Sequence, residues 1–290
     1  MPLPVINIAQ MREWEQATWA AGQTEAEVIR RVGARIARRA LQLTRPDDAI
    51  LILAGKGHNG DDARAAGDNL PGRRPVTLDI TAPGSGLPAL EQALRQKPAL
   101  IIDGLFGIGL DRPLDDDWGK IIQTVNESRL PVLAVDVPSG LNADTGEPLS
   151  PGRAVQAAVT LTIGAPKIGL LTTNAWPFVG RLEAVTGVGL APCPHTSRLN
   201  WTTADDFGDF PPRRSPAGHK GTFGHLAIVA GSFGFHGAAV LAARAAQRAQ
   251  PGLVTLFTQE AVYHVAASQL QSVMVNLWTP AFDKIWISCW

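Results

Sequence analysis

Carboxylate, amide and hydroxyl side chains follow three separate apolar segments of the sequence, at the point where each segment ends. Because the carboxyl ends of parallel strands share one edge of an open α/β sheet, and ligands bind in the crevice there, we expect these side chains to converge. One Asp at a strand end is more often a loop cap, but gathered carboxylates raise one another's pKa unless something compensates. A bound cation is the simplest compensation. The stretches are ILILAGKGHNGDD (50–62), LIIDGLFGIGLDRP (100–113) and LAVDVPSGLNADTG (133–146), with Asn59, Asp62, Asp103, Asp136 and Ser139 at the strand ends.

The first of these stretches contains a glycine-rich loop. Gly55, Gly57 and Gly60 match G-x-G-x-x-G between an expected strand and an expected helix, which favours a phosphate near the helix N-terminus. The loop also carries Asp61 and Asp62, whose charges repel a phosphate unless a cation or a neutral ligand face lies between. The alternative is that both aspartates only cap the helix.

The loop at 107–113 has a composition that suits close approach to a ligand. Gly107, Gly109 and Pro113 surround Arg112, whose guanidinium could contact a phosphate through two hydrogen bonds. Arg112 could equally be a solvated surface residue. Lys167 could face the same crevice, but we expect a lysine to lie on the surface.

Composition favours a small-molecule ligand. The chain has 290 residues, of which 45% are hydrophobic, and its 26 Lys and Arg balance 26 Asp and Glu, so no net field favours nucleic acid or an anionic membrane. Cys193 and Cys289 are too few for a disulfide framework, which fits a reducing compartment. The N-terminus has no signal-peptide pattern, and we expect a cytoplasmic protein without a membrane span.

Apolar periodicity predicts an α/β domain followed by part of a second one. The second part contains two or three strands and two helices, too little to close a doubly wound domain. Without a partner or further sequence to cover them, Trp278, Trp286 and Trp290 on its tail would form an exposed apolar patch. The expected helices are 8–21, 24–43, 63–70, 118–125 and 238–249, and the expected strands are 50–54, 76–80, 100–102, 133–135, 159–163, 182–188, 225–230 and 253–257. The expected divisions are a domain at 1–190, a linker at 191–217 and a second unit at 218–290.

Several of these motifs together resemble a known family. GKGHNGDD (55–62), DGLFGIGLDRP (103–113), DVPSGLNADTG (136–146) and TLTIGAPKIGL (160–170), in that order, resemble the NAD(P)H-hydrate epimerase domain. HKGTFGHLAIVAGSFGFHGAAVLAARAAQRAQPGLV (219–254) resembles the opening of the ADP- or ATP-dependent NAD(P)H-hydrate dehydratase domain, which many bacteria fuse behind the first. The resemblance implies a Rossmann-like three-layer α/β/α domain with a parallel sheet, and then an incomplete ribokinase-like α/β unit.

The resemblance also implies a function and a set of site residues. The expected reaction interconverts the R and S epimers of NADHX and NADPHX, the C6-hydrated forms of NADH and NADPH. The protein is expected to be a homodimer that binds K⁺, whereas ADP or ATP with Mg²⁺ would serve only a complete dehydratase domain, so we expect no dehydratase activity. The implied potassium ligands are Asn59, Asp103 and Ser139, and the implied substrate contacts are His58, Asn59, Gly60, Asp61, Asp62, Gly107, Ile108, Gly109, Leu110, Asp111, Arg112, Pro113 and Asp136.

The sequence departs from the family pattern at two positions of the glycine-rich loop. The usual Asn-Asn-Gly-Gly-Asp is here His58, Asn59, Gly60, Asp61 and Asp62, so His58 keeps hydrogen-bonding capacity and Asp61 adds a charge.

The expected chemistry assigns a catalytic role to one residue. Inversion at a hemiaminal carbon needs an acid–base group near the hydroxyl, and we assign proton transfer to Asp136. Two rivals remain open. A pyridine-nucleotide dehydrogenase shares the glycine loop and would use Asp79 on the ribose, and a non-catalytic nucleotide-binding or scaffold module would keep only the fold.

Overall fold

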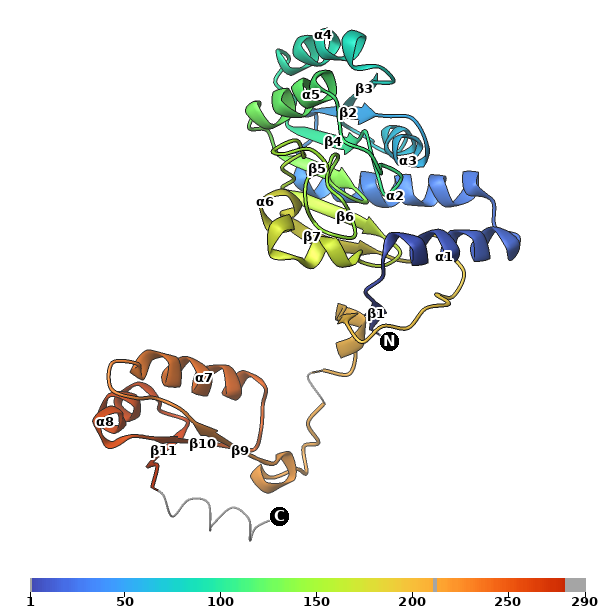
Figure 1. Ribbon diagram of the computed structural model, residues 1–290. Helices are drawn as coiled ribbons and strands as arrows, with labels where there is room; N and C mark the ends of the chain where they lie inside the picture. Colours follow the sequence, from blue (N-terminus) through green and yellow to red (C-terminus); the bar gives the residue numbers. More distant parts are fainter. Residues whose placement is uncertain (1, 211–212, 280–290) are drawn as a thin grey trace. The chain divides into compact units, whose positions relative to one another are not determined.

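The structure, a computed structural model, describes residues 2–210 and 213–279 (Figure 1). The chain divides into two compact units, Met1–Asp206 and Phe207–Trp290. The first unit therefore includes part of the segment 191–217 that was predicted as a linker. Of the tail tryptophans, Trp278 is 42% exposed, whereas Trp286 and Trp290 lie outside the described residues.

The first unit is built on a six-stranded parallel sheet. Its strand order is β3-β2-β4-β5-β6-β7, so the chain reverses direction across the sheet between β2 and β4. This doubly wound arrangement confirms the predicted Rossmann-like α/β class, and the reversal point is where such sheets bind ligands. The strands are β2 (Ala49–Ala54), β3 (Arg74–Asp79), β4 (Leu100–Gly104), β5 (Val132–Val135), β6 (Val159–Ile163) and β7 (Arg181–Val185).

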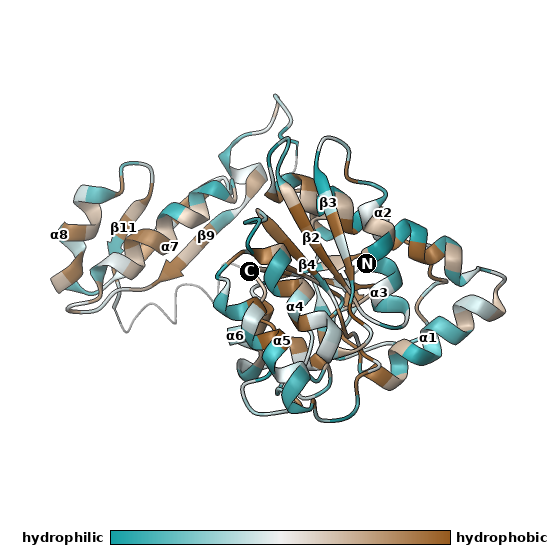
Figure 2. Ribbon diagram, turned by 90° about the horizontal axis from the view of Figure 1, so that it is seen from above, coloured by the Kyte–Doolittle hydropathy of each residue, from teal (hydrophilic) through white to brown (hydrophobic). Residues whose placement is uncertain are grey.

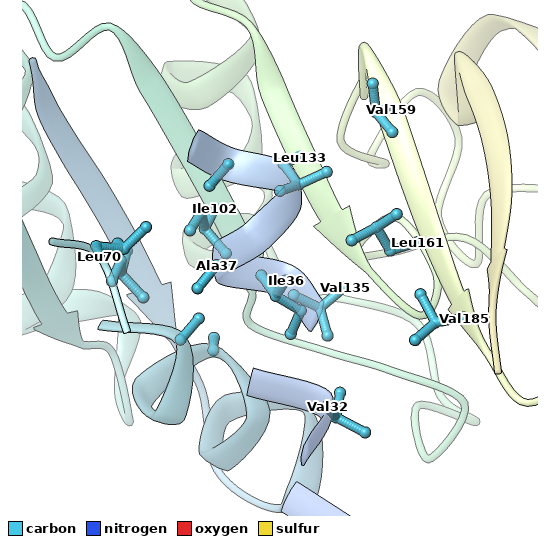
Figure 3. Close-up of a cluster of buried hydrophobic side chains, with 14 of the residues drawn as sticks. Val32, Ile36, Ala37, Leu70, Ile102, Leu133, Val135, Val159, Leu161 and Val185 are labelled. Atoms are coloured by element: carbon cyan, nitrogen blue, oxygen red, sulfur yellow. The ribbon is translucent and has the colours of Figure 1, made fainter. Parts of the chain in front are cut away.

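Helices cover both faces of this sheet. On one face, α2 (Glu25–Leu43) and α3 (His58–Gly67) share a core cluster with alternate residues of β2, β4, β5, β6 and β7 (Figure 3). On the other face, α4 (Pro83–Leu94) and α5 (Asp116–Glu127) pack on the remaining residues of β2, β4 and β5 (Figure 1). Because both faces of the central strands are buried, β2 (AILILA) is apolar along its whole length, and it is coloured as hydrophobic in Figure 2.

Helix α1 (Ile8–Ala20) lies beside the segment that follows β6. Asn7 caps it, since its side chain accepts a hydrogen bond from Gln10 N while the Gln10 side chain accepts one from Asn7 N. Trp14 anchors the helix through its indole N–H, which donates to Ala191 O at 2.7 Å. The aromatic ring also lies against Gly164, where a Cβ would come within 3.0 Å of it.

Two features of the first unit were absent from the prediction. Helix α4 was not predicted because it contains Gly84, Gly86 and Pro88, which have low helix propensity. It forms because Leu90 is fully buried against the sheet. The ribbon of β1 (Leu3–Pro4) and β8 (Asn200–Trp201) pairs residues far apart in sequence. The remaining short helices are α6 (Trp176–Val179) and the 3₁₀ turns Ile168–Leu171, Thr173–Ala175, Ala204–Phe207 and Lys220–Phe223.

The second unit contains a three-stranded parallel sheet. The strand order is β11-β10-β9, and α7 and α8 share one core cluster with β10. Large apolar side chains remain exposed here, with Phe233 at 84% and Phe235 at 71%. The bounds are β9 (His225–Val229), α7 (His236–Arg248), β10 (Leu253–Thr258), α8 (Glu260–Gln269) and β11 (Met274–Leu277). None of the helices among the described residues has the length and apolar character needed to cross a membrane.

Candidate active site

A cavity of about 680 Å³ opens at the carboxyl ends of β2 and β4 in the first unit. The loops after these strands line it together with residues of α1 and α2, at the reversal point of the sheet. Most predicted substrate contacts border it, whereas Gly60, Asp61 and Pro113 do not. The predicted residues in its lining are His58, Asn59, Asp62, residues 107–112 and Asp136.

The glycines of the first loop allow two loops to approach closely. A Cβ on Gly55 would lie 1.9 Å from Leu105 O, and one on Gly60 would lie 2.1 Å from Gly55 O. Neither position tolerates a side chain, because the neighbouring atoms belong to backbone. The glycine spacing therefore serves the contact between the loops after β2 and β4.

The charged residues around α3 have structural partners. The N-cap of α3 is Gly57, so the alternative in which Asp61 and Asp62 cap the helix is wrong. Asp61 pairs instead with Arg64, at 2.7 Å. Arg64 also pairs with Asp79 at 2.7 Å, and Asp79 does not line the cavity.

Asp103 and Ser139 are hydrogen-bonded to each other. Ser139 N donates to Asp103 Oδ2 at 2.9 Å, and Ser139 Oγ donates to Asp103 Oδ1 at 2.6 Å. Both residues are fully buried, and neither borders the cavity directly. Burial raises the pKa of Asp103, although the hydrogen bonds from Ser139 and Leu105 oppose that change.

Asn59 reaches the same loop from the other side. A Cβ built on Gly107 would lie 3.2 Å from Asn59 Oδ1, and Asn59 Nδ2 is buried without a hydrogen-bond partner among the described residues. Ser139 Oγ accepts a hydrogen bond from Phe106 N at 2.9 Å, so the turn at 104–107 is in contact with both Asn59 and Ser139. The three predicted potassium ligands therefore surround one turn.

The donor chemistry around this turn fits a hard cation. Carboxylate, amide and hydroxyl oxygens replace the hydration shell of such ions. Asp103 forms no ion pair with any described residue, so a cation would supply the missing positive charge. The part of the chain that the structure describes has no group of three or more His, Cys, Asp or Glu residues placed to hold a metal ion.

Lys167 is the largest correction to the sequence-based prediction. The expectation of a surface lysine is wrong, because Lys167 is fully buried. Its ammonium donates to Asp136 Oδ1 at 2.5 Å, to Ile163 O at 2.9 Å and to Thr162 Oγ1 at 3.2 Å. All three ammonium hydrogens thus have acceptors, and the buried charge has an opposite charge beside it.

Asp136 is held in a defined orientation by these contacts. Its backbone has φ of 62°, in the left-handed region that a non-glycine residue seldom adopts. Oδ1 accepts from Lys167 and from Ile163 N, the latter at 2.9 Å. Oδ2 accepts no hydrogen bond from the described residues, and Asp136 borders the cavity, so one carboxylate oxygen remains available to a ligand.

Two further carboxyls border the cavity without a compensating partner. Burial, and after it the neighbouring charges of Asp136, Asp61 and Glu15, together raise the pKa of Asp62 to about 8. Burial also raises the pKa of Glu15, with Asp136 as the next contributor. Sequence reasoning did not identify Glu15, although its position four residues after the buried Met11 on α1 places both on one face of that helix.

Comparison with known proteins identifies the family. The family model described as YjeF-related protein N-terminus matches residues 74–169. NAD(P)H-hydrate epimerase from Achromobacter xylosoxidans is 40% identical over 179 residues, which are 55% of this chain and 83% of that protein. The chain belongs to the NAD(P)H-hydrate epimerase family.

This epimerase-family chain also matches longer relatives. The bifunctional NAD(P)H-hydrate repair enzyme Nnr of Coxiella burnetii is 36% identical over 278 residues, covering 86% of this chain and 55% of that protein. The chain thus spans about half the length of the bifunctional relatives that it matches. Among solved structures, the yeast protein ynu0 (YNL200c) matches with a TM-score of 0.49 at 20% identity, covering 57% of this chain and 82% of that one.

Proposed function

We propose that this protein interconverts the R and S epimers of NADHX and NADPHX. The observation that carries the proposal is the free Oδ2 of Asp136 at the wall of a cavity situated at the reversal point of the sheet. Family membership supplies the substrate class, since the relative from Achromobacter xylosoxidans is named NAD(P)H-hydrate epimerase. The cavity volume of about 680 Å³ lies within the usual range for small-molecule and cofactor sites.

Asp136 would transfer the proton in this reaction. The substrate carbon is a hemiaminal centre, so inversion requires reversible loss of its hydroxyl, or ring opening, and return from the other face. Lys167 occupies Oδ1 and fixes the rotamer of Asp136, which leaves Oδ2 to exchange a proton with the substrate. Lys167 is a positioning residue in this scheme, because it is fully buried behind the carboxylate.

Potassium would be held by Asn59, Asp103 and Ser139. The support is the burial of Asp103 without an ion pair to another described residue and the position of Asn59 Oδ1 near Gly107. A bound K⁺ would supply the positive charge that this cluster lacks and would fix the turn at 104–107. The substrate loop at 107–113 continues from that turn, so its conformation depends on the cluster.

The proposal is tested with the purified R hydrate of NADH. The epimer ratio, followed by chromatography, should approach equilibrium faster with the protein than in a protein-free control. Asp136→Asn should slow this by about 100-fold or more, because the proton-transferring group is gone while the shape is kept. Equal rates with and without the wild-type protein would contradict the proposal, and a fully active Asp136→Asn would remove that residue from its role.

The potassium requirement is tested in the same assay. Replacing KCl by tetramethylammonium chloride at equal ionic strength should lower the epimerisation rate and the melting temperature, since the larger cation cannot enter the turn. Ser139→Ala should weaken the response to K⁺ by removing one oxygen ligand. An unchanged rate in potassium-free buffer would contradict this part of the proposal.

The same experiment separates the rival functions. A dehydrogenase would change the absorbance of NADH with a hydride acceptor, and a binding module would leave the epimer ratio alone. The pairing of Asp79 with Arg64 outside the cavity does not favour the dehydrogenase, which needs that carboxylate on a ribose. The expected lack of dehydratase activity, the homodimer and the cytoplasmic location stay predictions.

A further inference from the structure

One face of α1 forms part of the wall of the active-site cavity. Met11, Glu15 and Trp19 recur every four residues and all border the cavity. Met11 is buried, and Glu15 is the only acidic side chain on this apolar stripe. A carboxyl group at a position of this kind is costly unless it meets a polar partner.

Glu15 has no such partner in the protein itself. Its carboxyl forms no hydrogen bond and no ion pair with another described residue, although it is partly buried. Glu13, two positions earlier on α1, behaves differently, because its side chain is 65% exposed and approaches His195 at 3.5 Å. Helix α1 therefore carries an exposed glutamate, Glu13, and a second glutamate, Glu15, whose side chain lines the cavity.

The surroundings of Glu15 favour its protonated form more than solvent would. Burial raises the pKa of the Glu15 carboxyl, and Asp136 raises it further, against the opposing effects of Lys167, His58 and Arg12. The charged groups that act on the Glu15 carboxyl lie on four segments of the chain. They are Arg12 on α1, His58 and Asp62 on α3, Asp136 after β5 and Lys167 after β6.

We propose that Glu15 is a second proton-transferring residue of the epimerase, acting together with Asp136. The inference rests on the proposed function, since only a reaction that uses two faces of one carbon needs two such groups. Asp136 enters the cavity from the sheet edge, and Glu15 enters it from α1, so the two carboxyls belong to different walls. A single carboxyl could serve only one face without a large movement of the substrate.

The proton and the oxygen balance in each direction. Glu15 in its acid form donates its proton to the hydroxyl oxygen at C6, the C–O bond breaks with both electrons going to oxygen, and water leaves. The ring nitrogen shares the positive charge of the resulting cation. A water molecule then attacks C6 from the other face and gives a proton to the carboxylate of Asp136. Between turnovers in the same direction, Asp136 releases its proton to solvent water and Glu15 takes one up from solvent water, whereas the opposite inversion moves the proton from Asp136 back to Glu15.

The test compares Glu15→Gln with Glu15→Asp and Glu13→Gln in the full chain. Glu15→Gln should lower kcat by about 100-fold with KM nearly unchanged, because the amide keeps the shape but cannot transfer a proton. Its melting temperature should equal or exceed that of the wild type, since an unpartnered buried carboxyl has been removed. Glu15→Asp should restore part of the rate, and Glu13→Gln should behave as wild type.

Two further measurements separate catalysis from packing. The rate of the wild type should fall as pH rises through the raised pKa of Glu15, and this limb of the pH profile should be lost in Glu15→Gln but kept in Glu13→Gln. In water enriched in ¹⁸O, the label should enter the C6 hydroxyl at the epimerisation rate.

The outcomes that overturn the inference are distinct from those that overturn the function. An active wild type with a fully active Glu15→Gln refutes the role of Glu15 alone. A slow Glu15→Gln that also melts lower, with Glu15→Asp equally slow and the pH limb unchanged, assigns Glu15 to packing and refutes the role as well. A wild type that does not epimerise the hydrate refutes both proposals.

Discussion

Asp136 and Asp62 border the same cavity but have opposite surroundings. Asp136 has the buried ammonium of Lys167 at 2.5 Å and a backbone N–H on the same oxygen. Asp62 is 9% exposed, lies near three other carboxylates, and has no hydrogen bond or ion pair with another described residue. Asp136 thus has an opposite charge beside it, whereas Asp62 has none, and its raised pKa favours the protonated form.

The difference shows that two carboxyls at the wall of one cavity can have opposite electrostatic surroundings. Burial raises the pKa of Asp62 to about 8, so its carboxyl carries a proton at neutral pH. The positive charge of Lys167 acts on Asp136 more strongly than on Asp62, because Lys167 and Asp136 are in direct contact. Pairs of titratable groups in contrasting surroundings are typical of acid–base sites.

The largest effect is expected from breaking the Asp136–Lys167 pair. Lys167→Met leaves the buried carboxylate of Asp136 uncompensated, which should lower the unfolding free energy by about 3–5 kcal/mol and slow epimerisation. Urea denaturation measures the first and the epimer assay the second. The double variant with Asp136→Asn should recover part of the stability, since no unpaired charge then remains.

The matched control for this variant is an exposed lysine. Lys120→Met removes a surface ion pair with Asp117 on α5 and should leave the unfolding free energy nearly unchanged. If Lys167→Met were as stable as Lys120→Met, Lys167 would not supply the compensating charge, and the contrast between the two carboxyls would disappear.

A smaller effect of the opposite sign is expected at Asp62. Because its folded pKa of about 8 exceeds the ordinary value of 3.8, the folded protein binds a proton that the unfolded chain has lost between these pH values. This group therefore lowers stability as pH rises, and the penalty is complete above about pH 8. Asp62→Asn should raise the unfolding free energy by about 1–3 kcal/mol at pH 9 and by almost nothing at pH 4.

Urea denaturation at a series of pH values measures this difference directly. Asp68→Asn is the control, because Asp68 is an exposed carboxylate at the other end of α3 and should show no such pH-dependent gain. A gain for Asp62→Asn that is the same at pH 4 and pH 9 would mean that Asp62 is ionised at neutral pH like an ordinary surface carboxylate.

Much of the first unit was predictable from local patterns. The strands β2 and β5 are unbroken apolar runs because helices cover both faces of the sheet, and β4 begins with such a run before Asp103, so these strands are visible in the sequence. The parallel arrangement then implies that residues after these strands meet, as Asp103 and Ser139 do. Helix α4 was not predicted because its glycines and Pro88 disfavour a helix. The free energy gained by burial of its apolar side chains against the sheet exceeds that cost.

The candidate site was predictable where it follows strands and not where it depends on helices or buried charges. Glu15 is on a helix that is positioned by tertiary contacts, among them those of Trp14 with Gly164 and Ala191. Lys167 was expected on the surface because most lysines are exposed. The signal in its favour was its place four residues after the end of β6, beside the strand that carries Asp136 to the edge.

The order of the apolar runs, the polar residues at their ends and the family to which these motifs belong can all be recognised in the unfolded chain. Periodicity and spacing are local properties, so no three-dimensional information is needed for them. Which carboxyl has a counter-charge and which does not depends on the folded arrangement. The physical reason is that a pKa depends on burial and on charges a few ångströms away, and residues as distant in sequence as Glu15, Asp62 and Lys167 become neighbours of Asp136 only when the sheet and its helices have assembled.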